Sequence, residues 1–577
     1  GMCVLSCIGM NQPHVMVGTA PEASFWLLRS EDEYSEHLVE QDYWAAALEF
    51  ADSVGVDVVN TSLGYYAFDD KSKDFQFNMP NVIIGSDDNI NFPVKKEKTY
   101  TPTIEWANTD STNYDFLWTY NGREKLSTEK TLTHTFTEAG TFYLTFQMTD
   151  RTSKLTYGQD FKLTVSSEYF LGWLILAEDE TDGHSALSFI HMQTYELYPD
   201  VYKTLYPNNP LGSKPYRIET HYTSKADEIL IMQKGGDGLV ELNGSNFKKV
   251  IRTEEEFIGG AYPYAGFNPI RVAYTHKGPE LLLTDQGEIY DRINKKTTSM
   301  FQTASYSTIP FLHTSGSTSF TYFTFSGSTN FQLMFDNANK RWLAYHNTST
   351  IPYAIPIFTK GYTDNSYPGV FDFCNGMDAN IDLAYAETCN ESSNKCYLVH
   401  VLKDNTTGKH YIQVPTLTFS TSNYRITVTK PEQKEFASGY GIDDKTQYCL
   451  LRGSNTSFTA DPHLFFSVGK KVYFYRWSND KIYLYKDFGT GENAPTGDLV
   501  SMHTNGNAVE MGFGFSDGHF YICNIKKDII DKIARGDIDP LTDNQIEIQH
   551  YSGLGKIVHS VFKYGKSTNY LNARIEY

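Results

Sequence analysis

Leu171-Gly172-Trp173-Leu174-Ile175-Leu176, followed by Asp182-Gly183, is an apolar run that ends in a turn dipeptide. Asp-Gly favours a tight β-hairpin because glycine accepts the positive φ that such a turn requires. The same pattern of an apolar run before an Asp, Asn or Gly turn recurs from residues 229, 281, 331, 396, 464 and 511. Intervals of 47 to 68 residues between these starts can each hold one four-stranded sheet with its loops. We therefore predict a β-propeller, with seven blades, over residues 168–577.

Two other architectures fit this repeat less well. A parallel β-helix has a shorter and stricter period, and a second β-sandwich has too few strands to absorb seven hairpins. The longest intervals contain further candidate strands at 411–414 and 424–428, so the sequence leaves the blade number open by one. A ring of blades also needs closure, because an open seam exposes unpaired strand edges. We expect Ile557–Phe562 to pair within the blade that contains Trp173–Leu176.

A smaller β-rich region precedes the repeat. Phe116–Tyr120, the hairpin dipeptide Asn121-Gly122 and the aromatic run Ala139–Phe146 alternate short strands with turns. This pattern predicts a β-sandwich over residues 99–167, with a start near residue 81 left open. Residues 71–98 are polar and are interpreted as a linker or a first strand.

Trp118 and the later Gly140-Thr141-Phe142-Tyr143 resemble the PKD domain, an immunoglobulin-like module. A PKD-like sandwich followed by a propeller is similar to the PKD-like family lipoproteins of Bacteroidota, and this resemblance covers residues 80–577. It implies an accessory protein of outer-membrane nutrient uptake at the outer membrane surface or in the periplasm. The implied ligand is a glycan or peptide, and the implied partner is an outer-membrane transporter complex.

The N-terminal residues carry a different resemblance. The runs Val17–Ala23, Asp42–Ala47 and Val56–Gly64 are similar to the middle of a subtilisin-like serine protease. On this interpretation residues 1–70 are a truncated α/β fragment with a strand at Val56–Asn60, and Ser62, Leu63 and Gly64 are a remnant of the wall that binds substrate. The catalytic Asp, His and Ser of that family are missing from the chain, so we expect no catalysis. A generic strand-helix-strand unit is the alternative.

Composition limits the classes of function. The 577-residue chain has 20% charged residues and a formal charge of −20, which argues against a nucleic-acid partner. No apolar run reaches the length of about twenty residues that a membrane span needs. We expect no cofactor and no metal: Asp179, Asp182 and Gly183 hint at a calcium loop, but an ordinary hairpin turn explains them better. Cys389 and Cys396 are either a disulfide staple or ordinary buried thiols.

Two dipeptides place a cation beside an aromatic side chain on a predicted strand, Arg341-Trp342 and Arg476-Trp477. They are candidates for a surface that stacks on a sugar or grips a peptide, although each Trp fits equally well between blades. Three classes of function remain open: a noncatalytic cell-surface binding or scaffolding protein, a subtilisin-like protease fragment or fusion, and a propeller hydrolase or lyase. We favour the first, because no convergent catalytic set is visible.

Overall fold

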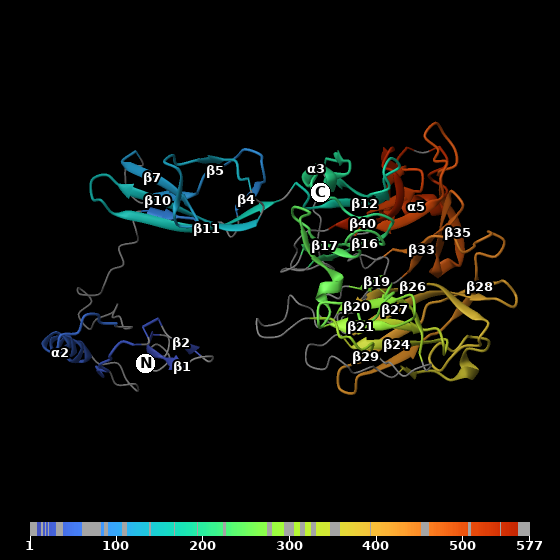
Figure 1. The fold of residues 1–577 in the computed structure, drawn as a ribbon, viewed down its shortest axis with the longest axis horizontal. Helices are drawn as coiled ribbons and strands as arrows, with labels where there is room; N and C mark the ends of the chain where they lie inside the picture. The colour runs from blue at the N-terminus through green and yellow to red at the C-terminus, as the bar shows by residue number, and fades with distance from the viewer. Residues whose placement is uncertain are drawn as a thin grey trace.

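The chain folds into a sandwich and a large ring of mainly antiparallel sheets, preceded by a short N-terminal part (Figure 1). The computed structural model describes residues 8–12, 16–17, 19–20, 22–30, 39–60, 82–85, 90–106, 112–137, 140–166, 168–192, 194–222, 227–273, 280–292, 305–311, 318–324, 331–346, 358–392, 394–451, 461–505, 509–542 and 544–563.

The sandwich has one five-stranded sheet in the order β4-β11-β10-β7-β8. Its strands are β4 Ile90–Pro93, β7 Tyr114–Tyr120, β8 Glu124–Ser127, β10 Gly140–Asp150 and β11 Thr156–Ser166. Two strand pairs complete it: β3 Val82–Ile84 with β6 Ile104–Trp106, and β5 Lys98–Tyr100 with β9 Leu132–His134. Trp118 is fully buried in its core, and its Nε1 donates to the Lys130 carbonyl at 3.3 Å. Trp118 is therefore a core anchor of the sandwich.

The described part of residues 172–563 forms seven sheets, numbered here in chain order. Sheet one contains β12 Gly172–Glu178, β13 Ser185–His191, β14 Leu197–Tyr198 and β40 Lys556–Lys563, and sheet two contains β15 Pro215–Tyr222, β16 Asp227–Gln233, β17 Val240–Asn243 and β18 Lys249–Arg252. Sheet three contains β19 Pro269–Ala273, β20 Glu280–Thr284 and β21 Ile289–Arg292, and sheet four contains β22 Phe320–Phe323, β23 Phe331–Asp336 and β24 Arg341–His346. Sheet six contains β32 Tyr448–Leu450, β33 His463–Val468, β34 Lys471–Arg476 and β35 Lys481–Asp487, and sheet seven contains β36 Leu499–Thr504, β37 Glu510–Phe515, β38 Phe520–Asn524 and β39 Glu547–Tyr551.

Sheet five has an irregular plan. Its strands are β25 Phe358–Lys360, β26 Ile381–Ser392, β27 Lys395–Asp404, β28 His410–Gln413, β29 Thr416–Ser420, β30 Arg425–Thr429 and β31 Gln433–Phe436. The long strand β27 pairs with β26 along one edge, while its other edge is shared between β28 and β29. The extra candidate strands near 411 and 424 therefore belong to one sheet.

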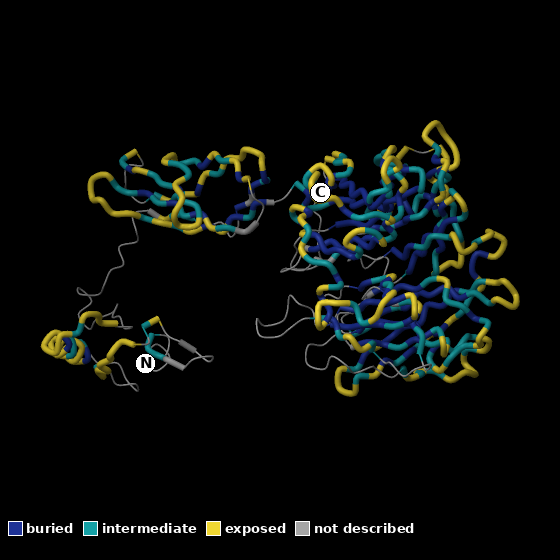
Figure 2. Tube along the Cα trace, viewed as in Figure 1, coloured by how far each residue is buried: buried dark blue, intermediate teal, exposed yellow. Residues whose placement is uncertain are grey.

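Each apolar hairpin that the sequence singled out forms two adjacent strands of one sheet. Neighbouring sheets bury apolar side chains between them; Leu174, Ile218 and Val561, for example, share one core cluster between sheets one and two. Figure 2 shows buried residues running through the whole ring. The sheets thus form a β-propeller, in which every sheet packs on its neighbours through apolar faces.

The ring closes through the C-terminal strand β40, which pairs antiparallel with β12 and lies beside it in Figure 1. Trp173 is paired with Phe562, and their ring centroids lie 5.0 Å apart. On its other side β40 contacts β15 and β36, which are the first strands of sheets two and seven. The prediction that Ile557–Phe562 closes the ring is confirmed.

The N-terminal part contains the strand pair β1 Asn11–Gln12 with β2 Met16–Val17 and the helix α2 Glu40–Ser53. The prediction of a strand at Val56–Asn60 is wrong, because these residues have no regular secondary structure. No partner strand lies beside them among the described residues, and Val58 is 82% exposed. Trp26 and Tyr43 are also more than half exposed, so the described residues of this part do not bury these large apolar side chains in a core.

Among the described residues, the propeller carries two short α-helices outside its sheets, α3 Val201–Leu205 and α5 Lys527–Arg535. In the described part of the chain, no helix combines the length and the apolar character that crossing a membrane requires. Cys389 and Cys396 are both buried. They occupy successive cross-strand pairs of β26 and β27, and their side chains enter different core clusters on opposite faces of the sheet, which explains why they form no disulfide.

Candidate functional site

The residues proposed from sequence as a ligand surface lie apart, on sheets four and six. Trp342 is fully buried, its ring packs on Phe335, and its Nε1 donates to Nδ1 of His400 at 3.1 Å. It is therefore a core residue, as the packing alternative expected, and its ring offers no face to a ligand. Arg341 pairs with the buried Asp336 at 3.3 Å.

Arg476 and Trp477 are half-buried and already have partners. Arg476 Nε contacts Asp461 at 2.6 Å, and its guanidinium reaches Asp531 of α5 at 3.5 Å. The Trp477 ring carries the ammonium group of Lys434 at 4.1 Å from its centroid. This cation–π contact occupies one face of the ring on which a sugar was expected to stack. Ser62, Leu63 and Gly64 lie outside the described residues.

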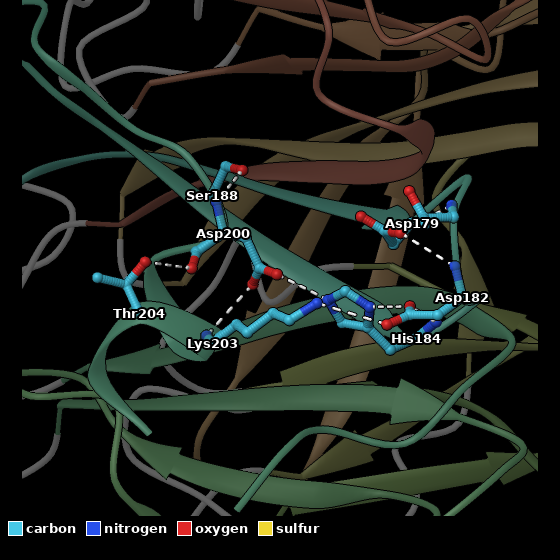
Figure 3. A network of polar contacts seen from close by, with 8 residues as sticks. Asp179, Asp182, His184, Ser188, Asp200, Lys203 and Thr204 are labelled. Atoms are coloured by element: carbon cyan, nitrogen blue, oxygen red, sulfur yellow. Dashed lines mark hydrogen bonds and ion pairs between the residues drawn. The ribbon is translucent and has the colours of Figure 1, made fainter. Parts of the chain in front are cut away.

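The hairpin between β12 and β13 holds the polar network of Figure 3, and Asp179, Asp182 and His184 are close enough there to share a metal ion. Asp179 Oδ1 accepts from the backbone N–H of Thr181 and of Asp182, as in an ordinary Asx turn. The prediction of a hairpin turn matches these contacts.

His184 lies between two carboxylates in this network, that of Asp182 at Nδ1 and that of Asp200 at Nε2, the latter at 2.7 Å (Figure 3). Burial opposes the charge of His184, but its hydrogen bonds to both carboxylates outweigh burial and raise its pKa. The hydrogen bond from His184 lowers the pKa of Asp182 to about 2. The imidazole of His184 thus ties Asp200, the N-cap of α3, to the hairpin, and both of its ring nitrogens are engaged.

A second polar cluster, which we call the axial cluster, is built from one strand in each of several sheets around the ring. Its members are Arg217 and Glu219 of β15, Arg271 of β19, Tyr322 of β22, Glu387 of β26, His503 of β36 and His559 of β40. These strands belong to six of the seven sheets. Arg217 and His559, more than 300 positions apart in sequence, therefore interact where β40 contacts β15.

The cationic groups of the axial cluster face aromatic and acidic partners. Arg217 Nε donates to Oε1 of Glu219 on the same strand. The Arg271 guanidinium lies 4.8 Å above the Tyr322 ring. Burial opposes the charge of Arg271, while Tyr322, Glu219 and Glu387 favour it and raise its pKa. Glu219 and Glu387 are each about 6% exposed, so their charges lie in a medium where electrostatic interactions are strong.

His559 lies on the cationic side of the axial cluster. Burial lowers its pKa well below the ordinary value, and the charges of Arg217, His503 and Arg271 lower it further. The Ile218 carbonyl accepts a hydrogen bond from the ring. The Nδ1 atom is buried and has no hydrogen-bond partner among the described residues. A neutral imidazole thus presents an unsatisfied acceptor in this cluster.

Sequence reasoning missed the axial cluster. Each member lies on a strand next to an apolar hairpin, and the sequence pattern marks the hairpins rather than these neighbouring strands. The available signal was a charged residue inside a short β pattern, as in Arg217-Ile218-Glu219 or Ile270-Arg271-Val272. That signal does not show which of these residues lie close to one another, because their proximity depends on how the ring of sheets closes.

Residues 68–215 match the sequence model of the PKD-like family. The match includes the sandwich and runs on through β14 of sheet one. Comparison with curated proteins finds no match.

Several solved structures are similar to the chain at low identity. A quinonprotein alcohol dehydrogenase-like protein from Bacteroides thetaiotaomicron is 11% identical, with 82% of this chain and 94% of that chain covered and a TM-score of 0.29. Sqt1 from Saccharomyces cerevisiae is 10% identical, with 61% of this chain and 80% of that chain covered and a TM-score of 0.34. The β-propeller domain of Cps50 (Swd1) from Myceliophteria thermophila is 9% identical, with 60% of this chain and 89% of that chain covered and a TM-score of 0.33.

Proposed function

We propose that the protein is a noncatalytic binding protein of the bacterial cell surface that presents a ligand site at the axis of a seven-bladed propeller. One observation supports this most directly: the axial cluster gathers charged and hydrogen-bonding groups from six sheets in one place. Burying charged groups costs free energy, and apolar packing alone can stabilise such a fold. A cluster of buried charged groups at the axis therefore favours a role in binding over a role in stability.

The sandwich serves in this proposal as a spacer or contact module. It has its own buried core around Trp118, so it folds as a unit beside the propeller. The match of residues 68–215 to the PKD-like family supports a location outside the cytoplasm. We infer that the protein assists uptake of glycans or peptides across the outer membrane, next to a transporter complex.

A binding screen tests this function. The full chain is applied to immobilised glycans and peptides, in parallel with Arg271→Gln at the axis and Arg425→Gln, an exposed residue at the start of β30, as a matched control. We expect at least one glycan or peptide to bind the natural chain and the control, and to lose binding to Arg271→Gln. Ligands that bind all three proteins equally would refute an axial binding role, and so would the absence of any ligand.

A further inference from the structure

The last strands of sheet seven bring two imidazole rings into direct contact. Nδ1 of His519 and Nε2 of His550 lie 2.9 Å apart. His519 immediately precedes β38, and His550 lies on β39, the outermost strand of the sheet. Because Tyr521 is paired with His550, His519 lies on the same face of the sheet, two residues away from Tyr521 and diagonal to His550. The register of β38 and β39 therefore fixes this histidine pair.

Further contacts hold both rings in place. The Tyr521 ring stacks on the His550 ring with centroids 4.3 Å apart, and the Tyr521 hydroxyl donates to the Asn493 carbonyl. Asp517, two residues before His519, accepts backbone hydrogen bonds from the loop that leads into β36. Both histidines are partly exposed, so small ions reach the pair from solvent. Such preorganised groups bind without a large cost of ordering side chains.

The charges around the histidine pair suit a cation. Burial lowers the pKa of His550, and the charges of His519 and Lys486 lower it further, while Glu547 opposes this shift. His550 is therefore a neutral imidazole at pH 7, the form that binds metal ions. The ammonium group of Lys486 is itself paired with Glu547 at 3.0 Å. Asp517 interacts favourably with a positive charge at His519, so it adds negative potential on the other side of the pair.

The separation of the two nitrogens matches that of neighbouring ligands on one metal ion. Nitrogens that are bound at about 2.0–2.1 Å and at a right angle to each other lie about 2.9 Å apart. Square-planar and tetragonal sites of nitrogen and oxygen ligands are typical of Cu(II) and Ni(II), for which imidazole is a suitable ligand. Calcium and magnesium take oxygen ligands instead. The histidine pair therefore selects for transition metals.

We propose that His519 and His550 bind one divalent transition-metal ion through Nδ1 and Nε2, respectively, with water in the remaining coordination positions. In the metal-free pair, one of these two nitrogens carries the hydrogen that it donates to the other. On binding, this hydrogen moves to the second nitrogen of the same ring, so both imidazoles stay neutral and no net proton is released. Protonation of either ring blocks coordination, so the affinity rises with pH.

Titration calorimetry of the full chain with Ni²⁺ at about pH 7.5 tests the proposal, with Ca²⁺ as a divalent ion that takes oxygen ligands. We expect Ni²⁺ to bind more tightly than Ca²⁺, and its affinity to fall about tenfold or more in His519→Gln and in His550→Gln. His410→Gln, which removes a partly exposed histidine of β28, should keep the natural affinity. At about pH 5.5 the natural chain should also lose about tenfold or more in affinity for Ni²⁺.

The imidazole NMR signals of the natural protein provide a readout that needs no variant. The His550 signals, assigned by nuclear Overhauser contacts with the Tyr521 ring, should broaden at the first additions of paramagnetic Ni²⁺, before those of histidines elsewhere. Broadening that starts at His184 instead would place the metal at another site and overturn the proposal. An affinity for Ni²⁺ that is unchanged in both histidine variants, or no higher than that for Ca²⁺, would also overturn it.

Discussion

Glu178 and Lys556 are directly opposed across the seam where β12 meets β40. Opposed residues of antiparallel strands have Cα atoms about 4.5–5.5 Å apart, which lies within the range that a disulfide spans. Lys556 is exposed and Glu178 is half-buried, so cysteines at both positions leave the apolar core of the seam intact. We expect Glu178→Cys/Lys556→Cys to oxidise readily and to lock the ring.

The size of the effect follows from the length of chain that the crosslink closes. The loop is about 380 residues long, for which the chain-entropy relation gives about 6 kcal/mol, and engineered disulfides commonly deliver about 2–4 kcal/mol. A gain of that size should raise the melting temperature of the propeller by several degrees over the same protein in reductant. Peptide mapping under non-reducing conditions identifies the bond, and calorimetry in the presence and absence of reductant measures the gain.

The matched control is Glu180→Cys/Lys556→Cys, which moves one cysteine two residues on into the exposed hairpin turn. Two residues along a strand displace the Cα by about 7 Å, which is too far for a disulfide. Equal crosslinking of both pairs would show that the seam has no fixed register. A Glu178/Lys556 crosslink that leaves the melting temperature unchanged would show that ring closure does not limit unfolding.

Three further predictions follow from particular residues. Burial lowers the pKa of His400 to about 4, against about 6.5 in an unfolded chain, so the unfolded state takes up the proton first and the free energy of unfolding falls by about 3 kcal/mol as pH drops from 6.5 to 4. Denaturant unfolding at several pH values in that range should show a weaker dependence of this free energy on pH in His400→Gln. Trp342→Phe, which removes the hydrogen-bond donor to Nδ1 of His400, should lower the free energy of unfolding by about 1–3 kcal/mol at pH 7. The chain should not label with a fluorophosphonate probe, and a labelled serine would contradict the noncatalytic interpretation. Limited proteolysis should cut between Asp69 and Val82, before the first strand of the sandwich, and leave a resistant fragment of about 500 residues. An N-terminal part as resistant as the propeller would contradict the exposure of its described apolar side chains.

The apolar hairpins of this protein could be predicted from sequence because their signals are local. An apolar run followed by a turn dipeptide determines two neighbouring strands, and Gly183 has the positive φ of 73° that its turn position requires. The same local logic predicted the sandwich around Trp118. It left Cys389 and Cys396 open between a disulfide and buried thiols, because the face of the sheet that each side chain enters depends on the pairing of β26 with β27. It failed at Val56–Asn60, because a strand needs a partner strand that no local pattern supplies.

Tertiary structure alone decided which polar residues meet. Arg217 and His559 are brought together only when β40 returns across the ring to pair with β12, and that register is set by apolar packing such as Trp173 on Phe562. Trp342 shows the same limit of sequence-based prediction. Its position next to Arg341 suggested a ligand surface, but packing between sheets four and five buries its ring. Sequence therefore determined the repeating hairpins of the sheets. Which polar residues gather in the axial cluster depended on ring closure, because the side chains on these strands gain their neighbours from other sheets.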